Sequence, residues 1–98
     1  MPQTENHFQA DIIRELKAAL PDCLILKQDP NYCLGIPDLL ILYRNRWASL
    51  EIKRNENAPH RPNQDYYIDI MNKMSFAAFC YPENKDDVLK QLLLFFTR

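Results

Sequence analysis

The stretch from residue 35 to residue 53 places the tightest limits on how this chain can fold. The block from Gly35 to Tyr43 contains a continuous apolar run beside turn residues, which suits a strand buried on both faces. Arg44, Asn45 and Arg46 then supply a natural turn. From Trp47 to Lys53 apolar and polar residues alternate, as they do in a strand with one buried face. The stretch therefore predicts a β-hairpin in the middle of a sheet.

The segments around this hairpin predict the rest of the fold. Thr4 can cap a first helix in which apolar residues recur every four positions, and Pro21 closes that helix. In chain order, the elements after this helix are predicted as strands near 24–26, within 35–43 and at 47–53, a helix capped by Asn63, a strand at 76–81, and a helix from Asn84 or Asp86 to Phe96. The order αβββαβα predicts an α/β fold in which helices flank a mixed central sheet.

Composition limits the class of protein further. With 98 residues and 47% hydrophobic residues, the chain is expected to form one folded domain, 1–98. Its cysteines, Cys23, Cys33 and Cys80, show neither the spacing of a zinc site nor a secretory disulfide pattern, so we expect reduced thiols in a cytoplasmic protein. No signal-peptide pattern opens the chain, and no apolar run approaches the roughly 20 residues that span a bilayer. A soluble protein without membrane contact is expected.

The charge pattern gives a weak indication of a basic surface. The formal net charge of −1 provides no overall attraction to nucleic acid. Between residues 40 and 62, however, five cations stand against two anions, a local charge of +3. The candidate DNA-binding residues are Arg44, Arg46, Arg54 and Arg61, together with Lys27 upstream. Solvated side chains are the ordinary alternative for all of them.

The hairpin brings three ionisable residues together. With a turn at 44–45, Asp38 lies opposite Glu51, and with a turn at 45–46 it lies opposite Lys53. In both registers the three side chains share one face of the sheet, because side chains alternate with a period of two. Two carboxylates and a lysine are thus expected in one patch at the end of a central strand.

This set of residues suits phosphodiester hydrolysis with a metal ion. Adjacent carboxylates repel unless a cation lies between them, and hard oxygen ligands favour Mg²⁺, with Mn²⁺ as a substitute. Asp38 and Glu51 are the expected ligands, and the carbonyl of Ile52 is a candidate third ligand. Lys53 can orient the attacking water or offset charge on the phosphate. An ordinary Pro-Asp turn beside a half-exposed strand would contain the same three residues, so their spacing alone leaves both interpretations open.

Two motifs in this region resemble those of a nuclease family. Gly35-Ile36-Pro37-Asp38-Leu39-Leu40 and Leu50-Glu51-Ile52-Lys53-Arg54 are similar to the G-x-PD-hydrophobic and E-x-K motifs of PD-(D/E)XK nucleases. The chain most resembles the VRR-NUC branch, close to Holliday junction resolvases, from Glu5 to about Pro82. The resemblance implies a restriction-endonuclease-like core and a Mg²⁺-dependent endonuclease that acts on DNA.

Two further positions match that branch. By resemblance, Glu5 in the first helix would help to hold or orient the metal, and Gln64 would brace the site or the substrate. An acid in a first helical turn also complements the helix dipole, which is an ordinary role for Glu5. The segment before Gly35 is short and poor in arginine, which reduces the phosphate contacts expected there. Tyr66 and Tyr67 can stack on a base, although Tyr67 is expected to pack in the core.

The last helix is the basis for an expected homodimer. Residues 92–96 are apolar nearly all round, and a domain of this size is not expected to cover them all, so we expect a homodimer through this helix or an edge of the sheet. A two-fold dimer pairs two active sites, which suits a branched DNA such as a four-way junction. The alternatives are a nicking or flap nuclease on the same fold, a non-catalytic DNA-binding or accessory module, and a partner-binding protein.

Overall fold

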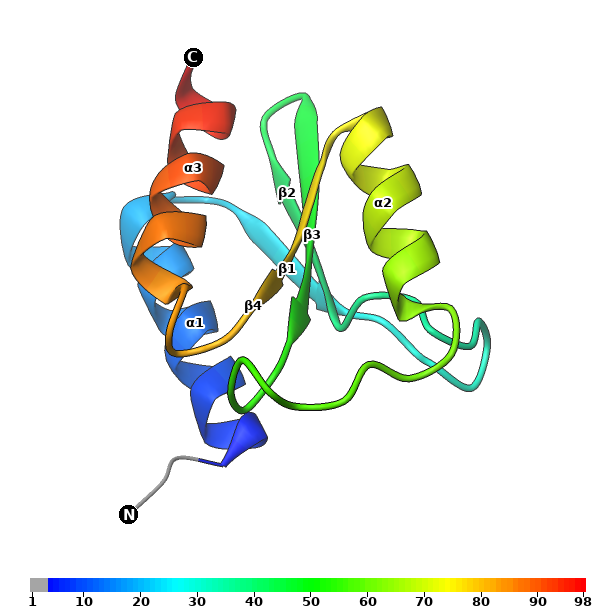
Figure 1. Ribbon diagram of the computed structural model, residues 1–98. Coiled ribbons are helices and arrows are strands. Elements are labelled where there is room, and N and C mark those ends of the chain that lie inside the picture. The colour runs from blue at the N-terminus through cyan, green and yellow to red at the C-terminus, as the bar shows by residue number, and fades with distance from the viewer. Residues whose placement is uncertain (1–3) are drawn as a thin grey trace.

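The chain forms helices and strands in the order that the sequence predicts. The computed structural model describes residues 4–98. The elements are α1 (Glu5–Ala19), β1 (Leu24–Lys27), β2 (Leu39–Tyr43), β3 (Arg46–Ile52), α2 (Gln64–Met74), β4 (Phe76–Cys80) and α3 (Lys85–Thr97) (Figure 1). The first helix begins as expected, because the Thr4 hydroxyl accepts a hydrogen bond from the amide of His7 at 3.1 Å. It ends two residues before Pro21.

The four strands form one mixed sheet in the order β1-β2-β3-β4. The first three are antiparallel, and β4 lies parallel to β3 after the crossover through α2. Tyr43 pairs with Arg46 and Leu39 with Leu50, so residues 44–45 form the turn. Of the two predicted registers, this is the one that sets Asp38 opposite Glu51.

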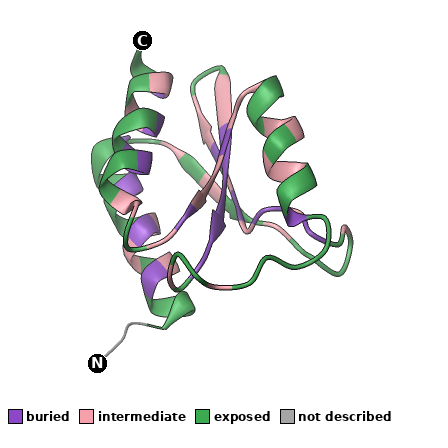
Figure 2. Cartoon of the chain, viewed as in Figure 1, coloured by how far each residue is buried: buried purple, intermediate pink, exposed green. Residues whose placement is uncertain are grey.

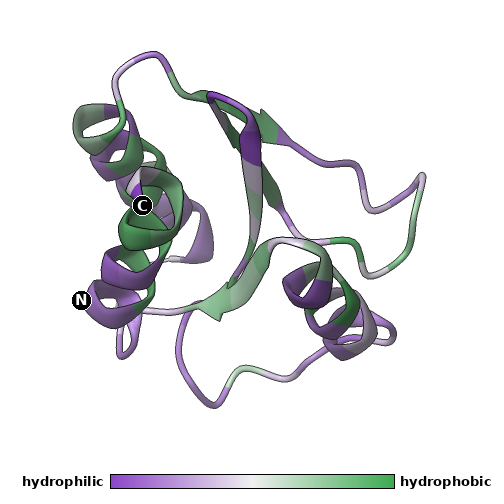
Figure 3. Cartoon of the chain, turned by 90° about the horizontal axis from the view of Figure 1, so that it is seen from above, coloured by the Kyte–Doolittle hydropathy of each residue, from purple (hydrophilic) through white to green (hydrophobic). Residues whose placement is uncertain are grey.

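The apolar core lies between the sheet and the pair of helices α1 and α3. Figure 3 shows these two helices on one face of the sheet and α2 on the other. The residues at every fourth position of α1 point into this core, and Ala48, Leu50 and Ile52 of β3 meet them from the sheet. Figure 2 shows the buried residues concentrated along this contact. The α/β class and the flanking helices are as predicted.

The face that carries α2 is covered less completely. As the crossover between β3 and β4, α2 packs over these two strands, and β1 lies at the opposite edge of the sheet. Leu24 and Leu26 of β1 are 54% and 43% exposed, and Leu40 and Leu42 of β2 are half-buried on the same side. The prediction that the second strand is buried on both faces is therefore correct for one face only.

The apolar residues of α3 are covered better than the sequence suggests. Leu92 and Phe96 are buried, Leu93 and Phe95 pack partly buried against the core, and Leu94 remains exposed. The expectation that the domain does not cover all of them holds for Leu94, and the others are covered because α3 packs beside α1 on one face of the sheet. Between residues 4 and 98, no helix is long and apolar enough to cross a bilayer.

Candidate active site

The predicted site residues meet at one end of the sheet. Asp38 directly precedes β2, Glu51 lies near the end of β3, and Lys53 follows that strand. The first turns of α1 and α2 and the loops 28–38 and 53–63 surround this end (Figure 1). Together they enclose a cavity of about 300 Å³. Its lining residues are Glu5, Pro30, Leu34, Gly35, Ile36, Asp38, Glu51, Lys53, Arg54, Ala58, Pro59, Arg61 and Gln64.

Hydrogen bonds on both sides hold Asp38 in place. Its Oδ2 accepts from the amide of Ile52 at 2.8 Å, which ties the side chain to β3. Its own carbonyl accepts from the amide of Gln28 at 2.8 Å. The Gln28 side chain donates to the carbonyl of Pro37 at 2.9 Å and to the Ser49 hydroxyl at 3.3 Å. Because the N–H and C=O of a strand residue point toward the same neighbouring strand, the Ile52 carbonyl also faces the side where Asp38 lies.

The carboxyl group of Glu51 is buried, with 3% of the residue exposed. Its Oε2 accepts a hydrogen bond from Nε2 of Gln64 at 3.1 Å. Burial is the main reason why the pKa of Glu51 rises from 4.5 to about 8, and the neighbouring charge of Asp38 adds to the shift while Lys53 opposes it. A more distant negative charge, on Glu5, raises this pKa further. In the absence of a cation, the two adjacent carboxyl groups therefore hold a proton at neutral pH.

Lys53 is buried as well and is held by neutral acceptors. Its Nζ donates to Oε1 of Gln64 at 2.7 Å and to the carbonyl of Pro59 at 3.0 Å. The same Oε1 accepts from the amide of Arg61 at 2.8 Å. Gln64 thus connects the carboxylate, the lysine and the loop in one network. An ammonium group has three donors, and two have acceptors among residues 4–98, so one remains for a ligand in the cavity.

Gly35 allows the two loops of the site to meet. Its φ is +90°, a conformation that side chains rarely adopt, and a Cβ there would lie 2.6 Å from Cβ of Asn63 and 2.7 Å from the carbonyl oxygen of Pro62. Asn63 occupies the N-cap position of α2 as predicted, but its side chain donates to the carbonyl of Leu34 at 3.4 Å and makes no capping bond. The lone glycine of the chain is thus required by backbone contact at the site.

The cationic residues proposed for DNA contact divide between the two ends of β3. Arg54 and Arg61 line the cavity, and Lys27 is exposed at the last position of β1, at the same end of the sheet. Arg44 and Arg46 lie at the hairpin turn, at the other end of β3. Glu51 lies five residue steps along the strand from Arg46, a length of about 17 Å. There Arg46 donates to the carbonyl of Phe95 and lies 5.6 Å from the centre of its ring.

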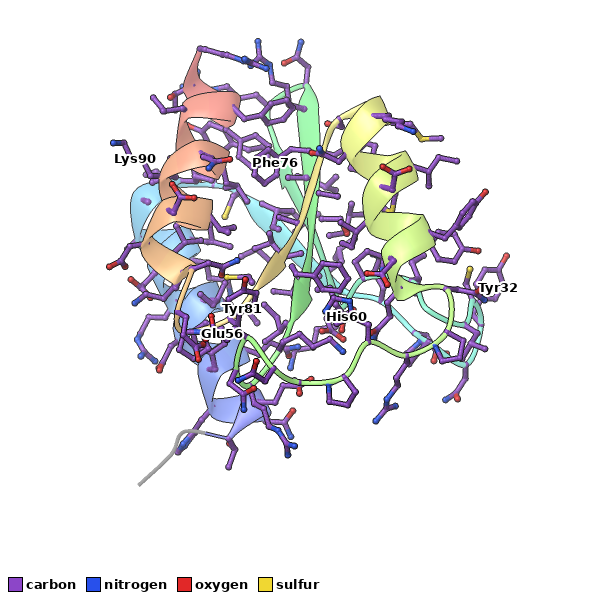
Figure 4. All side chains as sticks on the ribbon, in the orientation of Figure 1. Tyr32, Glu56, His60, Phe76, Tyr81 and Lys90 are labelled. Atoms are coloured by element: carbon purple, nitrogen blue, oxygen red, sulfur yellow. The ribbon has the colours of Figure 1, made fainter. Side chains whose placement is uncertain are left out.

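Two residues that shape the site, Gln28 and Pro59, were not singled out in the sequence. Gln28 anchors the backbone at Pro37 and Asp38, and Pro59 supplies an acceptor for Lys53. His60, labelled in Figure 4, stacks on Phe79 with ring centres 4.1 Å apart, and Phe79 pairs with Glu51 in the register of β3 and β4. A polar residue at the end of a β-prone segment was the available signal for Gln28. Loop carbonyls and ring stacking leave no such signal, because they depend on tertiary contacts.

The donor set at this end of the sheet suits a cation that keeps part of its water shell. Within residues 4–98, no group of three or more His, Cys, Asp and Glu side chains is placed to hold a metal ion. Asp38 and Glu51 provide two adjacent carboxyl groups, and the backbone carbonyl of Ile52 is the candidate third ligand. Mg²⁺ is commonly bound through one or two carboxylates with several waters retained, so this pair fits Mg²⁺ better than Zn²⁺ or a calcium cage.

Comparisons with known proteins add no relatives to this description. The chain matches no family model, no curated protein sequence and no solved structure. The resemblance to the nuclease family consists of the two short motifs at 35–40 and 50–54 together with Glu5 and Gln64.

Proposed function

We propose that this protein is a Mg²⁺-dependent endonuclease of the PD-(D/E)XK kind that hydrolyses phosphodiester bonds in DNA. One observation carries the proposal: Asp38 and Glu51 lie together in a cavity beside a buried lysine with a free donor. Burying the Glu51 carboxyl group and the Lys53 ammonium beside the half-buried Asp38 is unfavourable for stability unless these groups are satisfied and used. Clusters with strongly shifted pKa values are typical of functional sites.

Asp38, Glu51 and the Ile52 carbonyl are the groups that would hold the metal, with Glu5 at the rim. When bound there, Mg²⁺ supplies Lewis-acid activation of the phosphoryl group and of water. The raised pKa of Glu51 supports this assignment, because a dication can replace the proton that the pair otherwise retains. The hydrogen bond from the Ile52 amide keeps the Asp38 carboxylate aimed at the same patch.

Lys53 is the group that we propose orients the attacking water or offsets charge on the scissile phosphate. Its third N–H can donate to an oxygen in the cavity and offset negative charge there. Gln64 is the positioning residue: its two amide atoms hold Lys53 and Glu51 at a fixed separation. Arg54 and Arg61 line the same cavity and supply positive charge for the phosphates on either side of the cut.

Branched DNA is the proposed substrate class, with the Holliday junction as first choice, and a homodimer is the proposed active form. The edge strand β1 supports the homodimer. Its Leu24 and Leu26 are exposed, and its backbone has a partner strand on one side only. A second copy could pair along this edge. Sedimentation of the wild type and of Leu26→Lys tests this, and a wild-type mass that stays monomeric at all concentrations would exclude the dimer.

The decisive experiment compares cleavage of labelled four-way junction, flap, single-stranded and linear duplex DNA in Mg²⁺ or Mn²⁺. Asp38→Asn should lower the rate by at least about a hundredfold, since even outer-shell partners of a metal contribute about 10–100-fold. The matched control is Asp22→Asn, at an exposed turn beyond the far end of α1 whose φ of 70° suits asparagine. Circular dichroism and thermal melting should show that both variants fold.

The outcomes separate the alternatives. Symmetric cuts in the junction that Asp38→Asn loses would establish a resolvase, and cuts confined to another DNA would keep the active site and change the substrate. Cleavage by Asp38→Asn at the wild-type rate would remove Asp38 from the mechanism. A folded protein that binds DNA and cuts none of these substrates would instead be a DNA-binding module.

A further inference from the structure

The loop between β1 and β2 carries an exposed apolar tip. Tyr32 is 91% exposed and Leu34 is 60% exposed, although both are large apolar side chains. Figure 4 shows Tyr32 at the outer end of this loop, on the side of the sheet where α2 lies. Tyr66, on the first turn of α2, is 60% exposed as well. Single exposed apolar residues are ordinary, but two on one loop beside a functional cavity mark a candidate contact surface.

The backbone on both sides of the tip is fixed. Before Tyr32, the Asp29 side chain accepts from the amide of Asn31 at 2.8 Å, and the Asp29 carbonyl accepts from the amide of Tyr32 at 3.1 Å. After it, the thiol of Cys33 donates to the Tyr67 hydroxyl at 3.1 Å. The contact of Gly35 with the start of α2 holds the following turn. A tip fixed in this way loses little conformational entropy when it binds a ligand.

The chemistry of the tip suits a nucleobase and not a phosphate. Residues 28–36 contain no lysine or arginine, and their one charged residue is Asp29, so the loop has nothing with which to attract a phosphate. An aromatic ring offers a face on which any base can stack. The cations of this region, Arg54 and Arg61, lie in the cavity lining beside the loop, where they can reach the backbone of the same strand.

The tip is continuous with the candidate active site. Pro30 and Leu34 both line the cavity that contains Asp38 and Glu51, and Tyr32 lies between them in the chain. A nucleotide whose phosphate lies in the cavity therefore places its neighbours near the tip. A base inside an intact duplex is already stacked on both sides, whereas a base at a branch point or an unpaired end has a free face.

We propose that Tyr32 and Leu34 form a stacking platform for the first unpaired or branch-point base of a DNA substrate. This rests on the proposed function, because the substrate strand must pass through the candidate active site. The platform selects DNA with an exposed base over continuous duplex. Proteins that insert apolar side chains between base steps use the same physical interaction.

The test uses a duplex with a single-stranded flap whose first unpaired base is 2-aminopurine, which loses fluorescence when stacked. Binding is measured in EDTA, so that a metal-dependent cut cannot remove the probe. The wild type should quench the probe, while Tyr32→Ala should lose the quenching and bind the flap about tenfold more weakly. Tyr32→Phe keeps the ring and should restore both. Met74→Ala, at an exposed residue in the last turn of α2, is the matched control and should behave like the wild type.

A linear duplex without unpaired bases separates stacking from general binding. Its affinity should be equal in the wild type and Tyr32→Ala, and equal losses on both DNAs would overturn the inference. Equal quenching in the two proteins would overturn it as well. Tyr32-dependent quenching without any metal-dependent cleavage would refute the nuclease alone and leave the platform in place. Failure to bind any of these DNAs would overturn the platform and favour a protein partner for this tip.

Discussion

The two faces of the sheet carry different kinds of side chain. On the face of α1 and α3, β3 contributes Ala48, Leu50 and Ile52 to a closed apolar core (Figure 2). On the face of α2, the same strand contributes Ser49 and Glu51, which belong to hydrogen-bond networks. The alternation of side chains along one strand thus separates the apolar core from the proposed active site. Between residues 48 and 52 of β3, the even-numbered residues face the core and the odd-numbered residues face the polar site.

The polar face stays folded because its buried groups satisfy one another. Within residues 4–98, every buried side-chain nitrogen and oxygen atom has a hydrogen-bond partner. Gln64 is the centre of this network, since its amide serves both Glu51 and Lys53. Leaving one such group unsatisfied costs about 1–3 kcal/mol, so the site constrains its own sequence nearly as tightly as the core does.

The largest effect on stability is expected when one leucine on each face of the sheet is replaced by alanine. Leu50→Ala, at a fully buried position of the core face, should lower the free energy of unfolding by about 2–5 kcal/mol. At protein concentrations low enough to keep the chain monomeric, Leu26→Ala, on the open side of β1, should change it by no more than about 0.5 kcal/mol. Urea denaturation monitored by circular dichroism measures both. Similar losses at the two positions would show that the α2 face is covered in solution, as it would be in a dimer through β1.

A pH-dependent effect on stability should arise on the polar face. Between pH 4.5 and about 8 the folded metal-free protein retains a proton on Glu51 that the unfolded chain has lost. Its free energy of unfolding should therefore fall as the pH rises through this window. Glu51→Gln cannot ionise, so at pH 8 it should be more stable than the wild type by about 1 kcal/mol or more, since each pKa unit corresponds to about 1.4 kcal/mol.

Thermal melts in EDTA from pH 5 to pH 8.5 measure this effect. The difference between the two proteins isolates Glu51, because both contain the same His7 and His60. Added Mg²⁺ or Mn²⁺ should raise the melting temperature of the wild type more at pH 8 than at pH 6, because the metal requires the deprotonated carboxylate. Parallel pH profiles for the wild type and Glu51→Gln would contradict the raised pKa.

Much of the fold follows from local patterns in the sequence. Helix α1 follows from the apolar residues at every fourth position after Thr4. The hairpin follows from the apolar run that ends at Tyr43, the turn residues after it, and the alternation of apolar and polar residues from Trp47 to Lys53. The grouping of Asp38, Glu51 and Lys53 needed only the parity of that hairpin. The sequence left two registers possible, with the turn at 44–45 or at 45–46, and the structure has the turn at 44–45.

Features that depend on packing between distant elements could not be predicted. How far the apolar residues of α3 are covered depends on how the helices lie against the sheet, which no local pattern describes, so the sequence could not tell that Leu94 stays exposed while Leu92 and Phe96 are buried. The open side of β2 depends on where the crossover places α2. The role of Gln28 depends on its pairing with Asp38, ten residues away, and hydrophobic periodicity carries no information about such a bond.

The smallest expected effect compares the two ends of β3 as contacts for DNA. Arg61 lines the cavity, whereas Arg44 lies at the hairpin turn with its guanidinium 5.0 Å from the centre of the Tyr43 ring. If DNA contacts the site end alone, Arg61→Ala should weaken binding a few-fold and reduce the slope of log affinity against log salt by about 1, as loss of one phosphate contact does. Arg44→Ala should leave both quantities unchanged.

Fluorescence anisotropy between 50 and 200 mM salt measures the slopes, because the affinity due to phosphate contacts changes steeply over about this range. Equal changes in the two variants would mean that the duplex runs along the whole length of the strand, and the predicted role of Arg44 and Arg46 in DNA binding would then hold.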